Sequence, residues 1–225
     1  MKTNTEKTLF LVALVAAAVN AALSLLYILQ LPEQVPMHFD INWVCDGYGS
    51  RWIGLGISVL APLAALSLPL TLKMQKHEQN RKPAAVMMLI ITGYCIAINW
   101  IVMLAFGSKV QLGETYEKPV LGWALPLVFS AMFVAIGNYL PILRQNNGLG
   151  LRIKWTLENE QCWKLTHRFA GKLWVITGLL LTAVSIIAAV IGLESGIWIL
   201  VLLFEMFVVN VAVPCIYAYM HREGA

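Results

Sequence analysis

The feature that most constrains this chain is a series of six long apolar runs, at residues 9–31, 52–72, 84–106, 120–143, 173–193 and 197–219. Each run is long enough to cross a hydrocarbon core of about 30 Å, which takes ~20 helical residues. A backbone in lipid must satisfy its own N–H and C=O groups, and no run shows the alternation of a half-buried strand. The sequence therefore predicts an all-α integral membrane protein, a bundle of six transmembrane helices.

The distribution of the basic residues predicts the orientation of this bundle. The chain has 16 Lys and Arg residues, and all except Arg51, Lys109 and Lys118 fall on one side of the predicted membrane. Short connections on the cytoplasmic side carry the excess of Lys and Arg. We therefore expect both termini in the cytoplasm of a cell whose plasma membrane holds the protein. The anionic leaflet accounts for the basic connections, so no direct nucleic-acid partner is predicted.

Two connections are longer than simple turns, and we expect function to concentrate there. The outer one, 32–51, belongs to a predicted N-terminal membrane region, 1–118, and the inner one, 144–172, to a predicted C-terminal region, 119–225. Each region contains three spans. In the inner connection Thr156 is expected to cap a helix, with Cys162, Leu165 and Phe169 on one face. This pattern predicts an amphipathic helix in the cytoplasmic interface before the fifth span; the alternative is that these residues extend the fifth helix.

The outer connection carries the candidate recognition residues. Pro36 restricts the backbone and Tyr48 is aromatic. The three polar residues are His38, Asp40 and Asp46. Imidazole and carboxylate groups can bind zinc, but a single His in a Pro-rich loop favours a shaped recognition loop over a metal site. No sequence motif of a nucleophile elbow, a zinc hydrolase or a phosphate-binding loop occurs in a credible context. The sequence thus predicts a protein that is not an enzyme and holds no metal or cofactor.

Glu205 is the acidic residue deepest in the predicted membrane, eight residues into the sixth span and roughly 12 Å below its outer boundary. Asn20 in the first span reaches about the same depth, so the two are expected to meet, and Asn99 in the third span is a second candidate partner. An intramembrane carboxyl is a functional-site hypothesis by default, as a proton relay or ligand contact. The alternative is a structural clamp to an Asn across a helix interface.

A set of residues from the fourth span onward resembles a known signature. It reads Gly137-Asn138-Tyr139-Leu140-Pro141, Asn146, Gly150-Leu151-Arg152, Trp155-Thr156-Leu157, Trp163, Thr166-His167-Arg168 and Gly171. The chain is similar here to the SdpI family of bacterial membrane proteins. The outer connection, with Pro36, His38, Asp46 and Tyr48, resembles the domain of unknown function that often precedes that family. Trp43 stands where the family usually has Gly, and Lys154 where Pro often precedes the Trp-Thr pair.

The resemblance implies an immunity role and no catalytic residues. The family's namesake protects its bacterium from a secreted peptide toxin that attacks the membrane, and it is thought to draw a repressor to the membrane once occupied. The implied partners are the lipid bilayer, a peptide toxin and a cytoplasmic repressor protein. Two other classes compete with this interpretation. A small transporter or channel would use Glu205, Asn20 and Asn99 as a polar path, and a membrane enzyme would use His38, Asp40 and Asp46.

Overall fold

A computed structural model describes residues 1–117, 120–192 and 196–223 of the chain. Its α-helices are α1 (Asn4–Gln30), α2 (Ile53–Ser58), α3 (Leu60–Lys73), α4 (Arg81–Phe106), α5 (Val120–Gly137), α6 (Lys154–Glu158), α7 (Glu160–Ile191), α8 (Ile197–Phe204) and α9 (Val213–Met220). Short 3₁₀ turns lie at Glu78–Asn80 and Leu140–Ile142, and a π-helix, η3 (Glu205–Ala212), joins α8 to α9. Six helical segments of the described chain have the length and apolar content to cross a membrane. The predicted bundle of six spans is confirmed; Lys118 and the predicted end of the fifth span at 193 lie outside the described residues.

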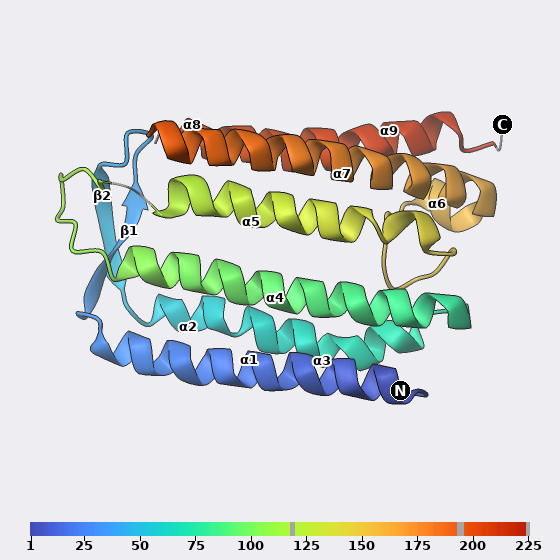
Figure 1. Cartoon of the computed structure of the whole chain (residues 1–225), viewed down its shortest axis with the longest axis horizontal. Coiled ribbons are helices and arrows are strands. Elements are labelled where there is room, and N and C mark those ends of the chain that lie inside the picture. The colour runs from blue at the N-terminus through green and yellow to red at the C-terminus, as the bar shows by residue number, and fades with distance from the viewer. Residues whose placement is uncertain (118–119, 193–195, 224–225) are drawn as a thin grey trace.

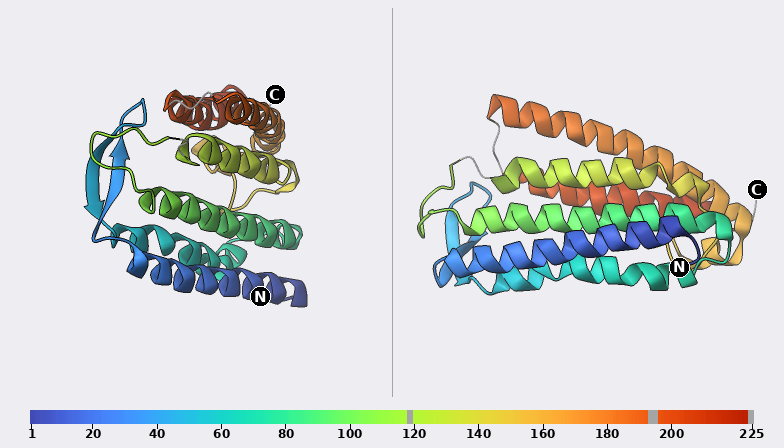
Figure 2. Two further views of the ribbon diagram at one scale, coloured as in Figure 1. Left: turned by 60° about the vertical axis from the view of Figure 1, so that its left-hand side comes forward. Right: turned by 60° about the horizontal axis from the view of Figure 1, so that its bottom comes forward.

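The six spans run side by side, and both chain ends lie at the same end of the bundle (Figure 1). From one side to the other, α1 and α3 pack on α4, α4 packs on α5, and α5 packs on α7 (Figure 2). The α8–η3–α9 segment continues this series beyond α5 and α7. The first and last spans are consequently separated by the helices between them.

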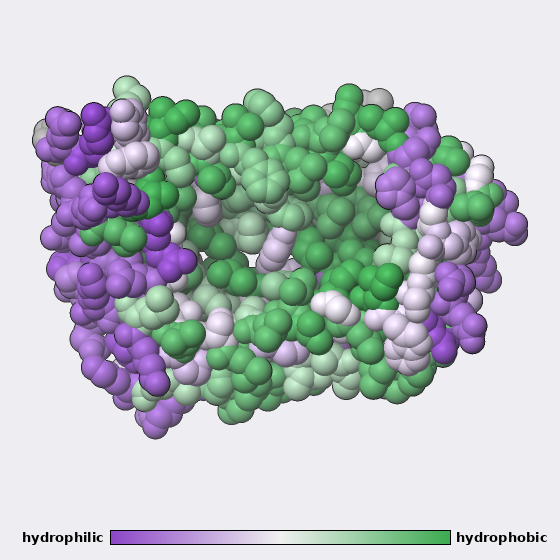
Figure 3. Space-filling view, turned by 180° about the vertical axis from the view of Figure 1, so that it is seen from behind, coloured by the Kyte–Doolittle hydropathy of each residue, from purple (hydrophilic) through white to green (hydrophobic). Residues whose placement is uncertain are grey.

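The outside of the bundle is apolar along its middle and polar at both ends (Figure 3). Leucines such as Leu11, Leu63 and Leu180 are 59–62% exposed. In water such a surface would be unstable, whereas lipid is its natural solvent. The protein is therefore a multi-pass membrane protein.

The outer connection folds into a β-hairpin that the sequence analysis did not predict. Strands β1 (Gln34–Phe39) and β2 (Cys45–Ser50) pair antiparallel at the end of the bundle opposite the termini (Figure 1). Backbone bonds tie β2 to the next outer loop, from Cys45 N–H to the Glu114 carbonyl (2.9 Å) and from Gly113 N–H to the Cys45 carbonyl (2.7 Å). Glycines and prolines interrupt the alternation that marks a strand, so the sequence signal was weak.

The inner connection does not contain the separate interfacial helix that was predicted. The amphipathic stretch belongs to α7, which begins at Glu160 and continues into the fifth span, so the alternative interpretation is correct. Asn159, not Thr156, caps this helix: its side chain accepts a hydrogen bond from Cys162 N–H (3.0 Å). The amphipathic pattern arises because one face of this part of α7 packs on the folded connection while the other faces water.

Candidate functional site

The five predicted recognition residues lie on the one hairpin. Pro36 and Tyr48 are opposite each other across its strands, and the Tyr48 hydroxyl donates to the Val110 carbonyl. Partial desolvation raises the pKa of the Tyr48 phenol. His38 Nδ1 is in contact with the Asp46 carboxylate, and both side chains are exposed.

Asp40 has a different role from His38 and Asp46. Its Oδ1 accepts hydrogen bonds from the backbone N–H groups of Asn42 and Val44, both at 2.8 Å, so it shapes the turn between the strands. The described part of the chain contains no cluster of three His, Cys, Asp or Glu side chains arranged to hold a metal ion. The hairpin thus offers an imidazole–carboxylate pair and an aromatic hydroxyl rather than a ligand set.

Trp43 occupies a strained position in the same turn. Its φ of 61° lies in the left-handed region that bulky residues avoid. Hydrogen bonds hold it there, from its own N–H to the Asp40 carbonyl (3.0 Å) and from Tyr116 N–H to its carbonyl (2.8 Å). Glycine, which the resemblance described above leads us to expect at this place, adopts this conformation without strain.

The three polar residues predicted inside the bundle, Asn20, Asn99 and Glu205, do not lie together. Asn99 Nδ2 donates to Ser24 Oγ (2.8 Å) and Asn20 Oδ1 (3.3 Å), which joins α4 to α1. The expectation that Asn20 meets Glu205 is wrong, because α1 packs on α2, α3 and α4 while Glu205 lies in the last span, beyond α5. Equal depth in the membrane does not make two helices neighbours. The polar path predicted for a transporter is therefore not continuous.

Glu205 begins the π-helix and bonds within its own span. Its Oε1 accepts from the carboxamide of Asn210, five residues later. Within a π-helix, residues five apart lie one above the other, so the wider turn brings these two side chains together. Glu205 is only 8% exposed, and its Oε2 has no hydrogen-bond partner among the described residues. A buried carboxyl with a free oxygen is costly, and such costs concentrate at functional sites.

A proline explains why the backbone widens here. Pro214 has no N–H to offer the carbonyl of Asn210, and its ring would clash with that carbonyl in a regular helix. The freed carbonyl accepts from the indole of Trp174 on α7 (2.8 Å). Thr177, also on α7, donates its hydroxyl to Asn210 Oδ1 (3.1 Å). The sixth span is thereby fastened to the fifth at the level of Asn210.

The residues of the C-terminal signature gather at the opposite end of the bundle from the hairpin. Around buried His167, Leu151 N–H donates to Nε2 (3.0 Å), so Nδ1 carries the proton and donates to the Trp163 carbonyl (2.9 Å). The Trp163 ring stacks on this imidazole at 3.9 Å. Gly150 has a φ of 107°, and a Cβ there would lie 2.3 Å from His167 Nε2. A side chain at position 150 would therefore collide with His167.

Asn146 organises the loop before that histidine. Its Oδ1 accepts from the N–H groups of Gly148 and Leu149, both at 2.8 Å, and its Nδ2 donates to the Arg144 carbonyl (2.9 Å). Thr156 Oγ1 lies 2.6 Å from the Leu151 carbonyl. We call this folded connection, residues 138–168, the inner loop segment.

The remaining signature residues lie within the inner loop segment or pack against it. The Trp163 indole donates to the Leu143 carbonyl (2.8 Å), and Trp155 packs edge-on against Tyr219. The Asn138 amide donates to the Val134 carbonyl and the Arg152 guanidinium to the Asn147 carbonyl, while Pro141 lies in the 3₁₀ turn and Arg168 is exposed. Most of the signature therefore maintains one loop conformation.

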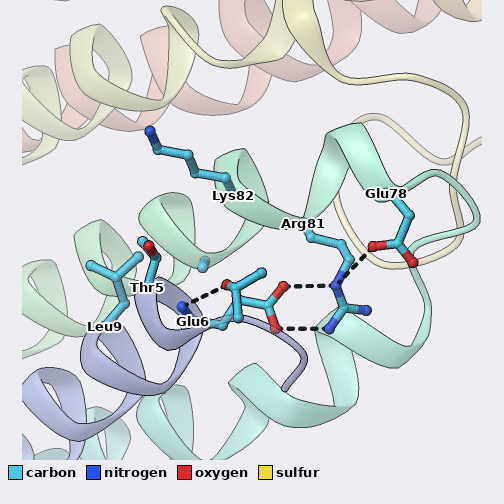
Figure 4. Close-up of a pocket in the computed structure, with 8 residues that line it drawn as sticks. Thr5, Glu6, Leu9, Glu78, Arg81 and Lys82 are labelled. Atoms are coloured by element: carbon cyan, nitrogen blue, oxygen red, sulfur yellow. Dashed lines mark hydrogen bonds and ion pairs between the residues drawn. The ribbon is translucent and has the colours of Figure 1, made fainter.

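A buried ion pair lies at the same end of the bundle and was missed by the sequence analysis. Arg81 donates from Nε to Glu6 Oε1 (2.7 Å) and from Nη2 to Oε2 (2.9 Å), a two-point contact between α4 and α1 (Figure 4). The side chains are 10% and 3% exposed, and Glu78 lies 3.6 Å from the guanidinium. Charges this close to the helix ends look like ordinary solvated residues, so no sequence signal links them.

Comparison with known proteins supports the resemblance on both halves of the chain. A model of the SdpI/YfhL protein family matches residues 142–218, and a model of a domain of unknown function, DUF1648, matches residues 10–61. The chain is similar to "Immunity protein SdpI" of Bacillus subtilis (strain 168), 22% identical over 214 residues, which are 95% of each chain. No solved structure matches the chain. The predicted resemblance to the SdpI family, with the DUF1648 domain before it, is confirmed, and the chain is a multi-pass bacterial membrane protein.

Proposed function

We propose that this chain is an immunity protein that protects its cell from a membrane-active peptide toxin. The observation that carries the proposal is the similarity to an immunity protein over 95% of both chains. The matched residues include the segments that form the hairpin and the inner loop segment in this chain. No catalytic step is needed for this role, since binding alone can keep a peptide from the bilayer.

The hairpin is the part that meets the toxin in this proposal. It lies at the end of the bundle opposite both termini, which is the outer end if the distribution of basic residues sets the orientation (Figure 1). Exposed His38, Asp46 and Tyr48 offer a polar and aromatic surface on a rigid two-stranded support. Binding surfaces commonly combine such groups with restricted backbone.

In this proposal the inner loop segment signals to a cytoplasmic repressor that the toxin is bound. Its backbone is held by buried side chains, and it exposes Arg152 and Arg168. Two-hybrid capture of the repressor by the whole chain, lost in an Arg152→Glu/Arg168→Glu variant and kept in Lys73→Glu/Lys76→Glu, would support this part. Toxin protection without any captured repressor would restrict the function to immunity.

Complementation tests the immunity role itself. A bacterial strain lacking its own immunity gene is challenged with the secreted peptide that kills it, with this chain or an empty vector present. We expect survival and a maintained membrane potential only with the chain. A His38→Ala/Asp46→Ala variant should lose protection at equal membrane abundance, while Gln111→Ala in the neighbouring outer loop should keep it. Equal killing with and without the chain, for every membrane-active peptide tried, would contradict the proposal.

A further inference from the structure

Two hollows adjoin at Pro141, at the end of the bundle that holds the termini. The first, of about 350 Å³, is lined by Arg144 and Lys164 among others. The second, of about 290 Å³, runs between α5 and α7 and is lined by Gly137, Gly171 and Lys172. Pro141 lines both hollows, and we call the two together the Pro141 groove.

The Pro141 groove carries unpaired positive charge. Arg144 and Lys164 line the first hollow and Lys172 lines the second. All three are exposed, and no ion pair of the described chain includes any of them. Glu160 is the one carboxylate among the residues that line the two hollows. Three cations against one anion attract a negatively charged group, and such attraction is strong where low-dielectric walls surround it.

The second hollow of the groove is largely apolar and points into the membrane. Gly137 and Gly171 line it where α5 and α7 pack closely, since a Cβ at Gly171 would lie 2.7 Å from Pro141 Cδ and from the Gly137 carbonyl oxygen. Val175 and Ile176 line its side, and Ile176 is 57% exposed. Ile176 follows Lys164 by twelve residues of α7, or roughly 18 Å along the helix axis. The charged and apolar ends are therefore spaced along the direction that a lipid takes in a bilayer.

We propose that the Pro141 groove binds one anionic phospholipid, of the phosphatidylglycerol type. The headgroup phosphate lies between Arg144 and Lys164, because guanidinium and ammonium groups are the usual partners of phosphate. One acyl chain lies in the second hollow, along Val175 and Ile176. A zwitterionic lipid fits less well, since its ammonium group would face the same cations, and a free phosphate would leave the apolar end unused.

Native mass spectrometry of the whole purified protein tests this site. The protein is released from micelles containing phosphatidylglycerol or phosphatidylethanolamine with identical acyl chains, and the fraction carrying one lipid is measured. We expect at least a tenfold preference for phosphatidylglycerol, and loss of that preference in Arg144→Gln/Lys164→Gln. The matched control is Lys73→Gln/Lys76→Gln, which removes two exposed cations from the same end of the bundle and should keep the preference.

A second pair of measurements separates the lipid from its headgroup. Ile176→Trp, which narrows the apolar end without changing charge, should lower phosphatidylglycerol retention severalfold, and millimolar glycerol phosphate should not displace the lipid. Equal loss of the phosphatidylglycerol preference in both double variants would show diffuse attraction and overturn the site. Equal retention of the two lipids by the unchanged protein would also overturn it. Displacement by glycerol phosphate would overturn the acyl-chain part and assign a soluble phosphate ligand.

Discussion

The buried glutamates of the two halves of the molecule, Glu6 in α1 and Glu205 in η3, have opposite surroundings. Both oxygens of Glu6 accept hydrogen bonds from Arg81, whereas Glu205 has only the Asn210 amide on Oε1 and no described partner on Oε2. A buried carboxylate whose two oxygens both accept from a cation stabilises the fold, and removal of the cation leaves an uncompensated charge. A carboxyl kept partly unsatisfied contributes little to folding, which favours a functional interpretation of Glu205.

The largest loss of stability is expected when the ion pair between Glu6 and Arg81 is broken. Arg81→Met leaves the Glu6 carboxylate buried without its cation, and we expect a loss of about 3–5 kcal/mol in the free energy of unfolding. Titration with SDS in mixed micelles, followed by Trp fluorescence, measures it. Lys82→Met is the matched control, because Lys82 is exposed and points away from the pair (Figure 4), and it should cost under ~0.5 kcal/mol. Equal losses in the two variants would remove the contrast between Glu6 and Glu205.

The C-terminal half should show its own large effect at Gly150. Gly150→Ala forces a residue with a side chain into a φ of 107° and against His167, at a cost of about 2–3 kcal/mol. Gly113→Ala has a similar φ of 83° but open space around it, so only backbone strain of ~1 kcal/mol is expected. The same SDS titration compares them. If both lose the same amount, the contact with His167 adds nothing.

A smaller loss of stability is expected at the hydrogen bonds between α1 and α4 that involve no charged group. Asn99→Ala removes the bonds to Ser24 and Asn20, and interhelical hydrogen bonds of this kind contribute ~0.6–1.7 kcal/mol. Ser24→Ala, which removes one of the two bonds, should cost less than Asn99→Ala in the same titration. A loss at Asn99 as large as that at Arg81 would mean that charge is not what distinguishes the Glu6 pair.

The smallest effect on stability is expected at Glu205. Glu205→Gln keeps the shape and the acceptor for Asn210 and removes no cationic partner, so the free energy of unfolding should change by under ~0.5 kcal/mol. The complementation assay then separates the two hypotheses for this residue. Lost protection with unchanged stability would assign Glu205 a functional role, whereas unchanged protection would remove the proton relay. A destabilisation comparable to that of Arg81→Met would show that Glu205 is as structural as Glu6.

The sequence by itself determined the six spans, because the length and apolar content of a run decide whether it can cross lipid. It also carried the family resemblance and the candidate hairpin residues, which are properties of residue types at fixed positions. Glu205, Asn20 and Asn99 lie in helical segments that are long and apolar enough to cross a membrane, and their depth in the bilayer stays a prediction.

Only the tertiary structure decided which side chains meet. Asn20 bonds Asn99 and not Glu205, and Arg81 reaches Glu6, because these contacts depend on how helices are ordered and rotated in the bundle. The hydrophobic pattern says little about that order when lipid surrounds most helices, since apolar residues then face outward as well as inward. Likewise, the amphipathic start of α7 predicts a separate interfacial helix, because its pattern does not reveal whether the apolar face meets lipid or the folded connection.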